Sequence, residues 1–171
     1  MKALFRLTLL VVVALALSSG SVFAATWRWV GSDDKTGFFY DTDEICFGKK
    51  PQNNVWGVAP DFTRVICWTK TVYTPGEAAQ YAEAIRDSRY YRLGYVISLV
   101  TFSIPNKTYT SHSSTYYSTE GDVIDSSDYE YTLNILPDSW GEALYDDIVD
   151  YARTNKSILA EKATGLPSFF Y

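Results

Sequence analysis

The chain is poor in the residues that most often perform chemistry or hold metals. Its 171 residues include one histidine, two cysteines and one methionine. Zinc sites draw several ligands from histidine and cysteine, so this composition argues against one. A catalytic triad needs a histidine beside a nucleophile, and only His112 can serve. We therefore expect no catalytic, cofactor-binding or metal-binding residues, no bound cofactor, and a protein that is not an enzyme.

Positive charge is also scarce. The chain has 15 lysines and arginines against 20 acidic residues, which gives a net charge of −5. Nucleic acids and anionic membrane surfaces both require a positive patch on the protein that binds them. The basic residues here are scattered, and Lys49 and Lys50 form the only adjacent pair. The sequence predicts no nucleic-acid partner.

A hydrophobic run long enough to span a membrane is missing as well. The apolar run Leu7–Leu17 is shorter than the ~20 residues that cross a bilayer. Lys2 and Arg6 precede it and small residues follow it, which is typical of a cleavable export signal. We predict cleavage between Ala24 and Ala25, with an uncleaved anchor as the alternative. An exported chain would lie in the periplasm, on the cell surface or outside the cell, with no transmembrane anchor after cleavage.

Aromatic residues, in contrast, are abundant. The chain has 14 tyrosines, nine phenylalanines and five tryptophans. Aromatic side chains favour strands, and tyrosine also favours recognition surfaces because it offers a large contact area at low entropic cost. Packing within a sheet is the alternative role for any one of them. The candidate binding surface comprises Tyr109, Tyr116, Tyr117, Phe169, Phe170 and Tyr171.

The pattern along the chain predicts an α+β fold with one antiparallel β-sheet of five or six strands packed with two α-helices. A signal peptide (1–24), a domain (25–153) and a C-terminal tail (154–171) would make up the chain. Alternating and β-branched residues place the strands at 25–30, 38–47, 64–73, 90–104, 107–118 and a short one at 123–124. A long polar loop is expected at 48–62.

Two helices are predicted at 75–88 and 139–153. Thr74 precedes Pro75 and stands three residues before Glu77, which is the pattern of a capped helix start. Ser139 and Glu142 repeat the same spacing before an apolar stripe of helical period. Helical structure in the tail is expected at most near residues 158–163.

The two cysteines are Cys46 and Cys67. They belong to the predicted strands 38–47 and 64–73, which we expect to pair antiparallel. In an exported protein an even number of cysteines suggests a disulfide. A bridge here would stabilise the fold by roughly 3 kcal/mol through the loop that it closes. Two buried free thiols are the alternative.

Acidic residues gather at two places, and the second merits a test for calcium, which prefers oxygen ligands. These residues are Asp41, Asp43 and Glu44, and then Glu120, Asp122, Asp125 and Asp128. The second group does not have the spacing of an EF-hand loop, and turns favour aspartate for their own hydrogen bonding. We therefore assign no metal to them.

An ordered set of short segments resembles a known family. They are Trp27-Arg-Trp-Val-Gly-Ser32, Phe39-Tyr-Asp-Thr-Asp-Glu-Ile45, Val65-Ile-Cys-Trp-Thr-Lys-Thr-Val-Tyr73, Tyr90-Tyr91, Ser113-Ser-Thr-Tyr-Tyr117, Gly121-Asp-Val-Ile-Asp-Ser-Ser127 and Ile135-Leu-Pro-Asp-Ser-Trp-Gly-Glu142. Over residues 26–153 the chain resembles the bacterial surface-adhesin protein E-like family. The resemblance implies an antiparallel sheet packed by helices, an exported envelope protein, and binding to host extracellular-matrix or serum proteins. It brings no catalytic residues with it.

The chain departs from that family in two respects. The family's prototype adhesin is a lipoprotein, whereas no cysteine stands at the predicted cleavage junction here. The loop 48–62 and the tail 154–171 also look like additions to the common core. Display on the cell surface therefore does not follow from the resemblance, and a periplasmic or released protein is an equal alternative.

These observations predict a non-enzymatic binding module of the bacterial cell envelope. In one form it is an adhesin whose protein partner comes from host matrix or serum. In the alternative it is a periplasmic accessory or structural protein that forms a homodimer or binds another envelope component. A small hydrolase is the remaining hypothesis, and its paired acidic residues would need a separation that sequence does not show.

Overall fold

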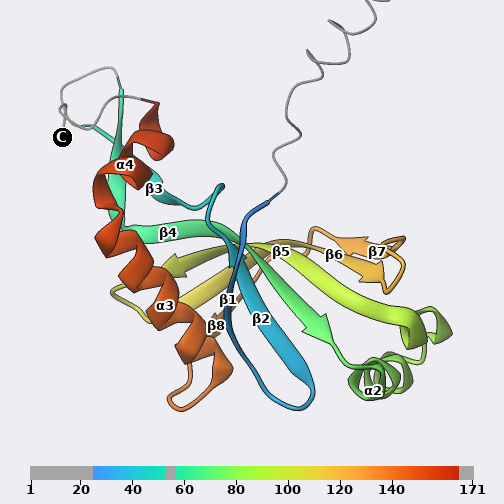
Figure 1. Ribbon diagram of the computed structural model, residues 1–171. Coiled ribbons are helices and arrows are strands. Elements are labelled where there is room, and N and C mark those ends of the chain that lie inside the picture. Colours follow the sequence, from blue (N-terminus) through green and yellow to red (C-terminus); the bar gives the residue numbers. More distant parts are fainter. Residues whose placement is uncertain (1–24, 53–56, 166–171) are drawn as a thin grey trace, which may run out of the picture.

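The computed structural model describes residues 25–52 and 57–165 of the chain, and its fold is α+β (Figure 1). The predicted signal peptide, with Ala24 at its end, and the aromatic residues Phe169–Tyr171 lie outside the described residues. Ala25, the first described residue, is exposed. None of the helices in the described ranges is long and apolar enough to cross a membrane.

All strand pairs in the described residues are antiparallel and belong to one sheet. Its strands are β1 (Trp27–Ser32), β2 (Thr36–Asp41), β3 (Cys46–Pro51), β4 (Val58–Tyr73), β5 (Leu93–Ser103), β6 (Thr108–Ser118), β7 (Val123–Ser127) and β8 (Tyr131–Asn134). They follow the order β1-β2-β4-β5-β6-β7, while β3 also pairs with β4 and β8 with β6. The sheet has eight strands, so the prediction of five or six was too low.

The extra strands have local causes. The expected strand 38–47 is interrupted because the buried carboxylate of Asp41 accepts hydrogen bonds from the backbone N–H groups of Thr26 and Asp43, which turns the chain. Much of the expected loop 48–62 is paired strand, with Lys49 opposite Pro60 and Pro51 opposite Val58. Residues 53–56 lie outside the described part of the chain. Strand β8 was missed because it is short and exposed throughout, with no alternation to reveal it.

The helices are α2 (Pro75–Ile85), α3 (Trp140–Thr154) and α4 (Lys156–Thr164), with a 3-10 turn η1 (Ser88–Arg92) before β5. Both predicted caps are confirmed. The Thr74 hydroxyl accepts from the Glu77 N–H at 3.4 Å, and the Ser139 hydroxyl accepts from the Glu142 N–H at 3.2 Å. Helix α2 ends earlier than predicted because the backbone of Arg86 adopts the left-handed conformation, with φ of 59°. Helix α4 was expected only in part.

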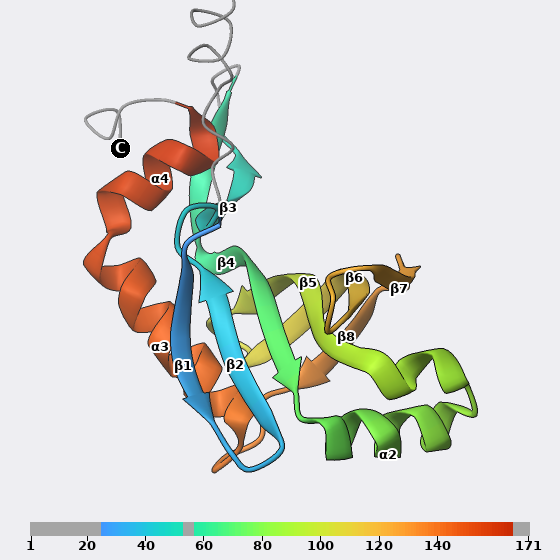
Figure 2. The same ribbon diagram turned by 45° about the vertical axis from the view of Figure 1, so that its right-hand side comes forward.

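The helices cover two ends of one sheet face (Figures 1 and 2). At one end α3 and α4 pack in an apolar cluster with β2, β3, β4 and β5, and α4 contributes Leu159, Ala160 and Ala163 to it. At the other end a second cluster joins α2 to β5, β6 and β7. We call this face, which bears Val65, Val96 and Val100, the inner face. The opposite face, which bears Trp68 and Ile97, is the outer face.

Cys46 and Cys67 are free thiols, so the structure does not contain the expected disulfide. Cys46 lies opposite Ile66 rather than Cys67 in the β3–β4 ladder. Because neighbouring residues of a strand point to opposite faces, this one-residue offset turns the two thiols away from each other. Cys67 is fully buried, and burial raises the pKa of its thiol.

Candidate functional site: a hydroxyl-lined cleft

Between its two apolar ends, the inner face of the sheet carries hydroxyl side chains. Along β4, Val65 and Cys67 are followed on the same face by Thr69 and Thr71. On β5, Ser98 separates the inward-facing Val96 from Val100. Opposite Ser98 and Val100 on β6 stand Ser114 and Ser111. We call Thr69, Thr71, Ser98, Ser111 and Ser114 the hydroxyl strip.

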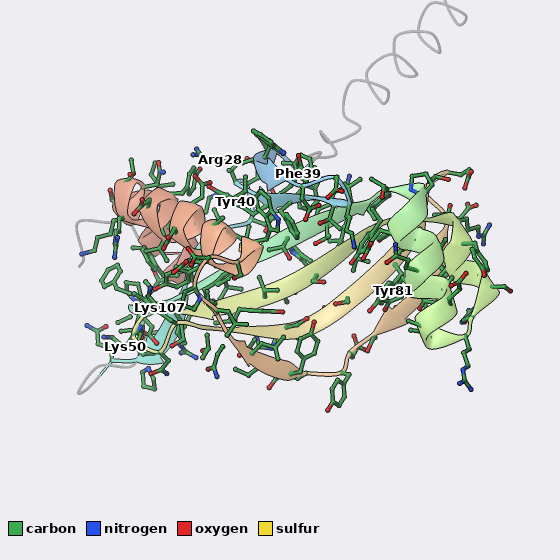
Figure 3. All side chains as sticks on the ribbon, turned by 90° about the horizontal axis from the view of Figure 1, so that it is seen from below. Arg28, Phe39, Tyr40, Lys50, Tyr81 and Lys107 are labelled. Carbon is green, nitrogen blue, oxygen red and sulfur yellow. The ribbon has the colours of Figure 1, made fainter. Side chains whose placement is uncertain are left out.

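The hydroxyl strip is the floor of a cavity of about 560 Å³, here called the cleft. Helix α2 contributes Glu77 and Tyr81 to one wall, and α3 contributes Trp140 and Leu144 to the other. Figure 3 views the molecule from below, with the strands open to view between the two helices and Tyr81 on α2. This volume falls within the roughly 300–1,000 Å³ of small-molecule sites.

Tyrosines form much of the rest of the lining. Five of them contribute, namely Tyr73, Tyr81, Tyr109, Tyr116 and Tyr131. The ring centroids of Tyr81 and Tyr116 lie 6.2 Å apart, and those of Tyr109 and Tyr131 lie 6.4 Å apart. Burial raises the pKa of Tyr73 to about 12 and raises the pKa values of Tyr81, Tyr109 and Tyr116 above their ordinary range. The four phenols with raised pKa values are therefore neutral at physiological pH, and each can donate and accept hydrogen bonds.

A one-residue bulge in β6 brings two of the predicted binding residues to the same face. Leu99 lies opposite Ser113 while Val100 lies opposite Ser111, so His112 is the extra residue. The bulge reverses the alternation of side chains along the strand. Tyr109 and Tyr116 consequently both line the cleft, although seven positions separate them. Tyr117 points to the outer face, where its ring stacks on Tyr95 at 4.8 Å.

Two polar oxygens of the lining are left without a hydrogen bond from any described residue. Ser111 is only 1% exposed, and its Oγ has no hydrogen-bond partner there. The second is Oε2 of Glu77, from which Lys35 Nζ lies 3.5 Å away. A buried polar atom without a partner costs about 1–3 kcal/mol, so Ser111 Oγ calls for an explanation, whereas Glu77 Oε2 already forms an ion pair with Lys35. A ligand that hydrogen-bonds Ser111 Oγ would supply that explanation.

His112 does not belong to the cleft. Its Nδ1 lies 2.7 Å from Glu130 Oε2 and its Nε2 lies 2.8 Å from Thr101 Oγ1. Thr101 is on the outer face, because it alternates with the inward-facing Val100 and Phe102. The carboxylate–imidazole–hydroxyl order resembles a catalytic relay. Neither His112 nor Thr101 lines the cleft or the second cavity described below.

The second cavity, of about 330 Å³, lies against the outer face and includes Tyr117. The first predicted acidic group, Asp41, Asp43 and Glu44, lines it. In the second acidic group, Asp125 Oδ2 accepts from the Tyr90 hydroxyl at 3.0 Å. The described residues contain no cluster of three or more histidine, cysteine or acidic residues arranged to hold a metal ion.

Tyr109 and Tyr116 were predicted binding residues and line the cleft, whereas the floor between them was not predicted. Ser98 and Thr69 interrupt the apolar inner positions of β5 and β4, and that interruption was the available signal.

Comparison of the whole sequence with known protein families finds no matching family, and comparison with curated proteins finds no similar sequence. The resemblance to the adhesin protein E-like family stays a prediction.

Proposed function

We propose that this protein is an exported binding module of the bacterial cell envelope that takes its ligand in the cleft. The observation that carries the proposal is the polar centre of the inner face. A sheet face covered at both ends by helices would gain stability from apolar residues throughout. Hydroxyl groups at Thr69, Ser98 and Ser111 favour ligand binding there, since the buried Ser111 hydroxyl has no hydrogen-bond partner in the part of the chain that the structure describes.

A binding role suits the cleft better than hydrolysis. A serine nucleophile needs a base within hydrogen-bond reach. Ser111 Oγ has no such partner among the described residues, and the Ser98 and Ser114 hydroxyls bond each other at 2.7 Å. The single histidine of the chain bonds residues outside the cleft. The cleft offers hydrogen bonding and ring contacts rather than an activated group.

The binding proposal is tested by titrating the purified protein with one probe of each ligand class and following amide NMR shifts. The probes are cellobiose, trialanine, spermidine and adenosine monophosphate. Saturable shifts centred on β4, β5 and β6 are expected for at least one probe. No saturable change at the cleft with any of the four would overturn the proposal.

Export is tested separately by cell fractionation and intact mass. We expect the protein outside the cytoplasm, with a mass that corresponds to a chain beginning at Ala25. Recovery of the uncleaved chain from the cytoplasm would contradict export. Protease treatment of intact cells then separates a displayed protein, which is cut, from a periplasmic one, which is protected.

A second candidate, an adhesin that binds a host protein, is favoured by the exposed strand β8. All four of its residues are exposed, and Tyr129 (76% exposed) and Leu136 (64% exposed) lie close to it in sequence. An exposed strand edge can pair with a strand of another protein. Binding to matrix proteins that survives Thr132→Pro would contradict a role for this edge, because proline removes the backbone N–H.

A further inference from the structure

The charge of the lining narrows the class of ligand, in an argument that rests on the proposed binding function. Glu77 is the single charged residue among the described residues that line the cleft. A phosphate or carboxylate would therefore meet no cationic side chain there, and an unpaired charge is costly to desolvate. A cationic ligand would have to compete with Lys35, whose Nζ lies 3.5 Å from Glu77. An uncharged ligand fits best.

The hydrogen-bonding groups of the lining narrow the class of ligand further. Nearly all polar side chains of the lining are hydroxyls, which donate and accept equally well. They match a ligand whose own groups both donate and accept. The buried Ser111 Oγ and the Ser98–Ser114 pair lie on the floor, so the ligand must present such groups at the bottom of the cleft.

The aromatic walls require a ligand that also has flat apolar surface. The rings of Phe38 and Trp140 stack at 5.4 Å, and both line the cleft together with Tyr81 and Tyr116. Aromatic rings pack well against flat apolar groups, and tyrosine adds a polar edge. A sugar ring has this form, since its carbon–hydrogen face is apolar and its rim carries hydroxyls.

A peptide matches the floor less well. Peptides that bind to sheets gain most of their affinity from backbone hydrogen bonds at a free edge. The floor lies on β4, β5 and β6, which are paired with neighbours on both sides along the strip. Their backbone groups are occupied, and only side chains face the ligand.

From these observations we infer that the cleft binds a neutral saccharide, held by the hydroxyl strip below and by aromatic rings at its sides. Ser98, Ser111 and Ser114 contact its hydroxyls, and Tyr81, Tyr116 and Trp140 pack against its ring faces. At the α2 end of the cleft, the Glu77 carboxylate accepts a hydrogen bond from one further hydroxyl of the saccharide.

The test compares two phenylalanine substitutions at neighbouring serines of β6. Ser114 faces the cleft, whereas Ser113, opposite Leu99, faces outward. Wild type, Ser114→Phe and Ser113→Phe are titrated by calorimetry with cellobiose, maltose and diacetylchitobiose, after circular dichroism has shown that each variant is folded. Ser114→Phe should weaken binding at least tenfold by filling the cleft, and Ser113→Phe should keep it within twofold.

Ser111→Ala provides a second variant that creates no bulk. It removes one hydroxyl from the floor and should weaken saccharide binding three- to tenfold, with no loss of melting temperature. This variant keeps the test informative if Ser114→Phe does not fold.

The outcomes separate this inference from the proposed function. In one outcome, trialanine, spermidine or adenosine monophosphate binds to the wild type and more weakly to Ser114→Phe, while no saccharide binds. That result overturns the saccharide inference and leaves the binding function intact. The inference is also overturned if Ser114→Phe and Ser111→Ala bind the saccharide as strongly as the wild type does. The saccharide would then bind outside the cleft. If no probe binds, both proposals fail.

Discussion

The α3–α4 end of the inner face and the hydroxyl strip beside it differ in side-chain chemistry, although the same strands build both. Val65 and Cys67 of β4 are fully buried against the α3–α4 cluster, and two residues later the same strand presents Thr69. On β5 the change falls between Val100 and Ser98. The apolar end stabilises the fold, and the strip gives up burial of apolar area for hydrogen-bonding groups. Removing side-chain atoms should therefore lower the free energy of unfolding at the apolar end and raise it at the strip.

The largest expected effect is at the apolar end. Ile148 of α3 is fully buried in the α3–α4 cluster. Ile148→Ala should lower the free energy of unfolding by about 3–4 kcal/mol, through lost burial and the cavity left behind. Urea denaturation measures the change. Ile158→Ala, at a position 57% exposed on α4, is the matched control and should cost less than about 1 kcal/mol.

At the α2 end of the inner face, the addition of one methyl group should already lower the stability of the protein. Gly94 is the extra residue of a bulge in β5, and a Cβ there would lie 2.8 Å from backbone atoms of Thr119. Gly94→Ala should cost about 2 kcal/mol because backbone must move to accept it. Gly76→Ala has nothing within 4 Å of the added atom and should not destabilise the protein. Equal losses from both substitutions in thermal unfolding would contradict this account.

In the hydroxyl strip, by contrast, a smaller side chain should raise the free energy of unfolding. Ser111→Ala removes a buried hydroxyl without a partner in the described residues and should raise the free energy of unfolding by about 1 kcal/mol. Ser118 of the same strand is equally buried, but its Oγ accepts from the backbone N–H groups of Glu120 and Asp122. Ser118→Ala should therefore lower stability by about 1–2 kcal/mol. Losses of the same size at both positions would show that Ser111 is a structural residue.

The last effect appears only at alkaline pH. Burial raises the pKa of Tyr73 at the cleft to about 12, whereas an unfolded tyrosine titrates near 10. The contribution of this phenol to stability is therefore complete below pH 10 and is lost as pH rises from 10 to 12. Tyr73→Phe should make the alkaline fall in stability shallower in denaturation at pH 9 to 12. Tyr129→Phe, at a position 76% exposed, should leave the curve unchanged.

Much of the local structure could be predicted because it depends on neighbouring residues. The Thr74 and Ser139 caps act within one helical turn, and both helix starts were predicted from them. A first strand was expected at 25–30, and β1 begins at Trp27, with Trp27 and Trp29 opposite Asp41 and Phe39 of β2. Strand β6 was predicted to within one residue at its start.

Features that depend on distant residues were not predicted. The break between β2 and β3 follows from a hydrogen bond between Asp41 and Thr26, which are 15 positions apart. The Cys46–Cys67 disulfide was expected because both strands were identified, but the ladder has an offset of one residue. Strand β8 exists because β6 extends beyond β7 and leaves an edge to pair.

By itself the sequence determined the fold class and the helix starts, and it marked Tyr109 and Tyr116 as candidates. Whether these two tyrosines share a face was decided by the bulge at His112, since a shift of one residue turns every following side chain to the other face. The cleft likewise required α2 and α3 to cover the two ends of one face, as Figures 2 and 3 show. The hydroxyl strip lies on the strands between them. Such relations arise from strand register and helix packing, which join residues far apart in the chain and which no local pattern encodes.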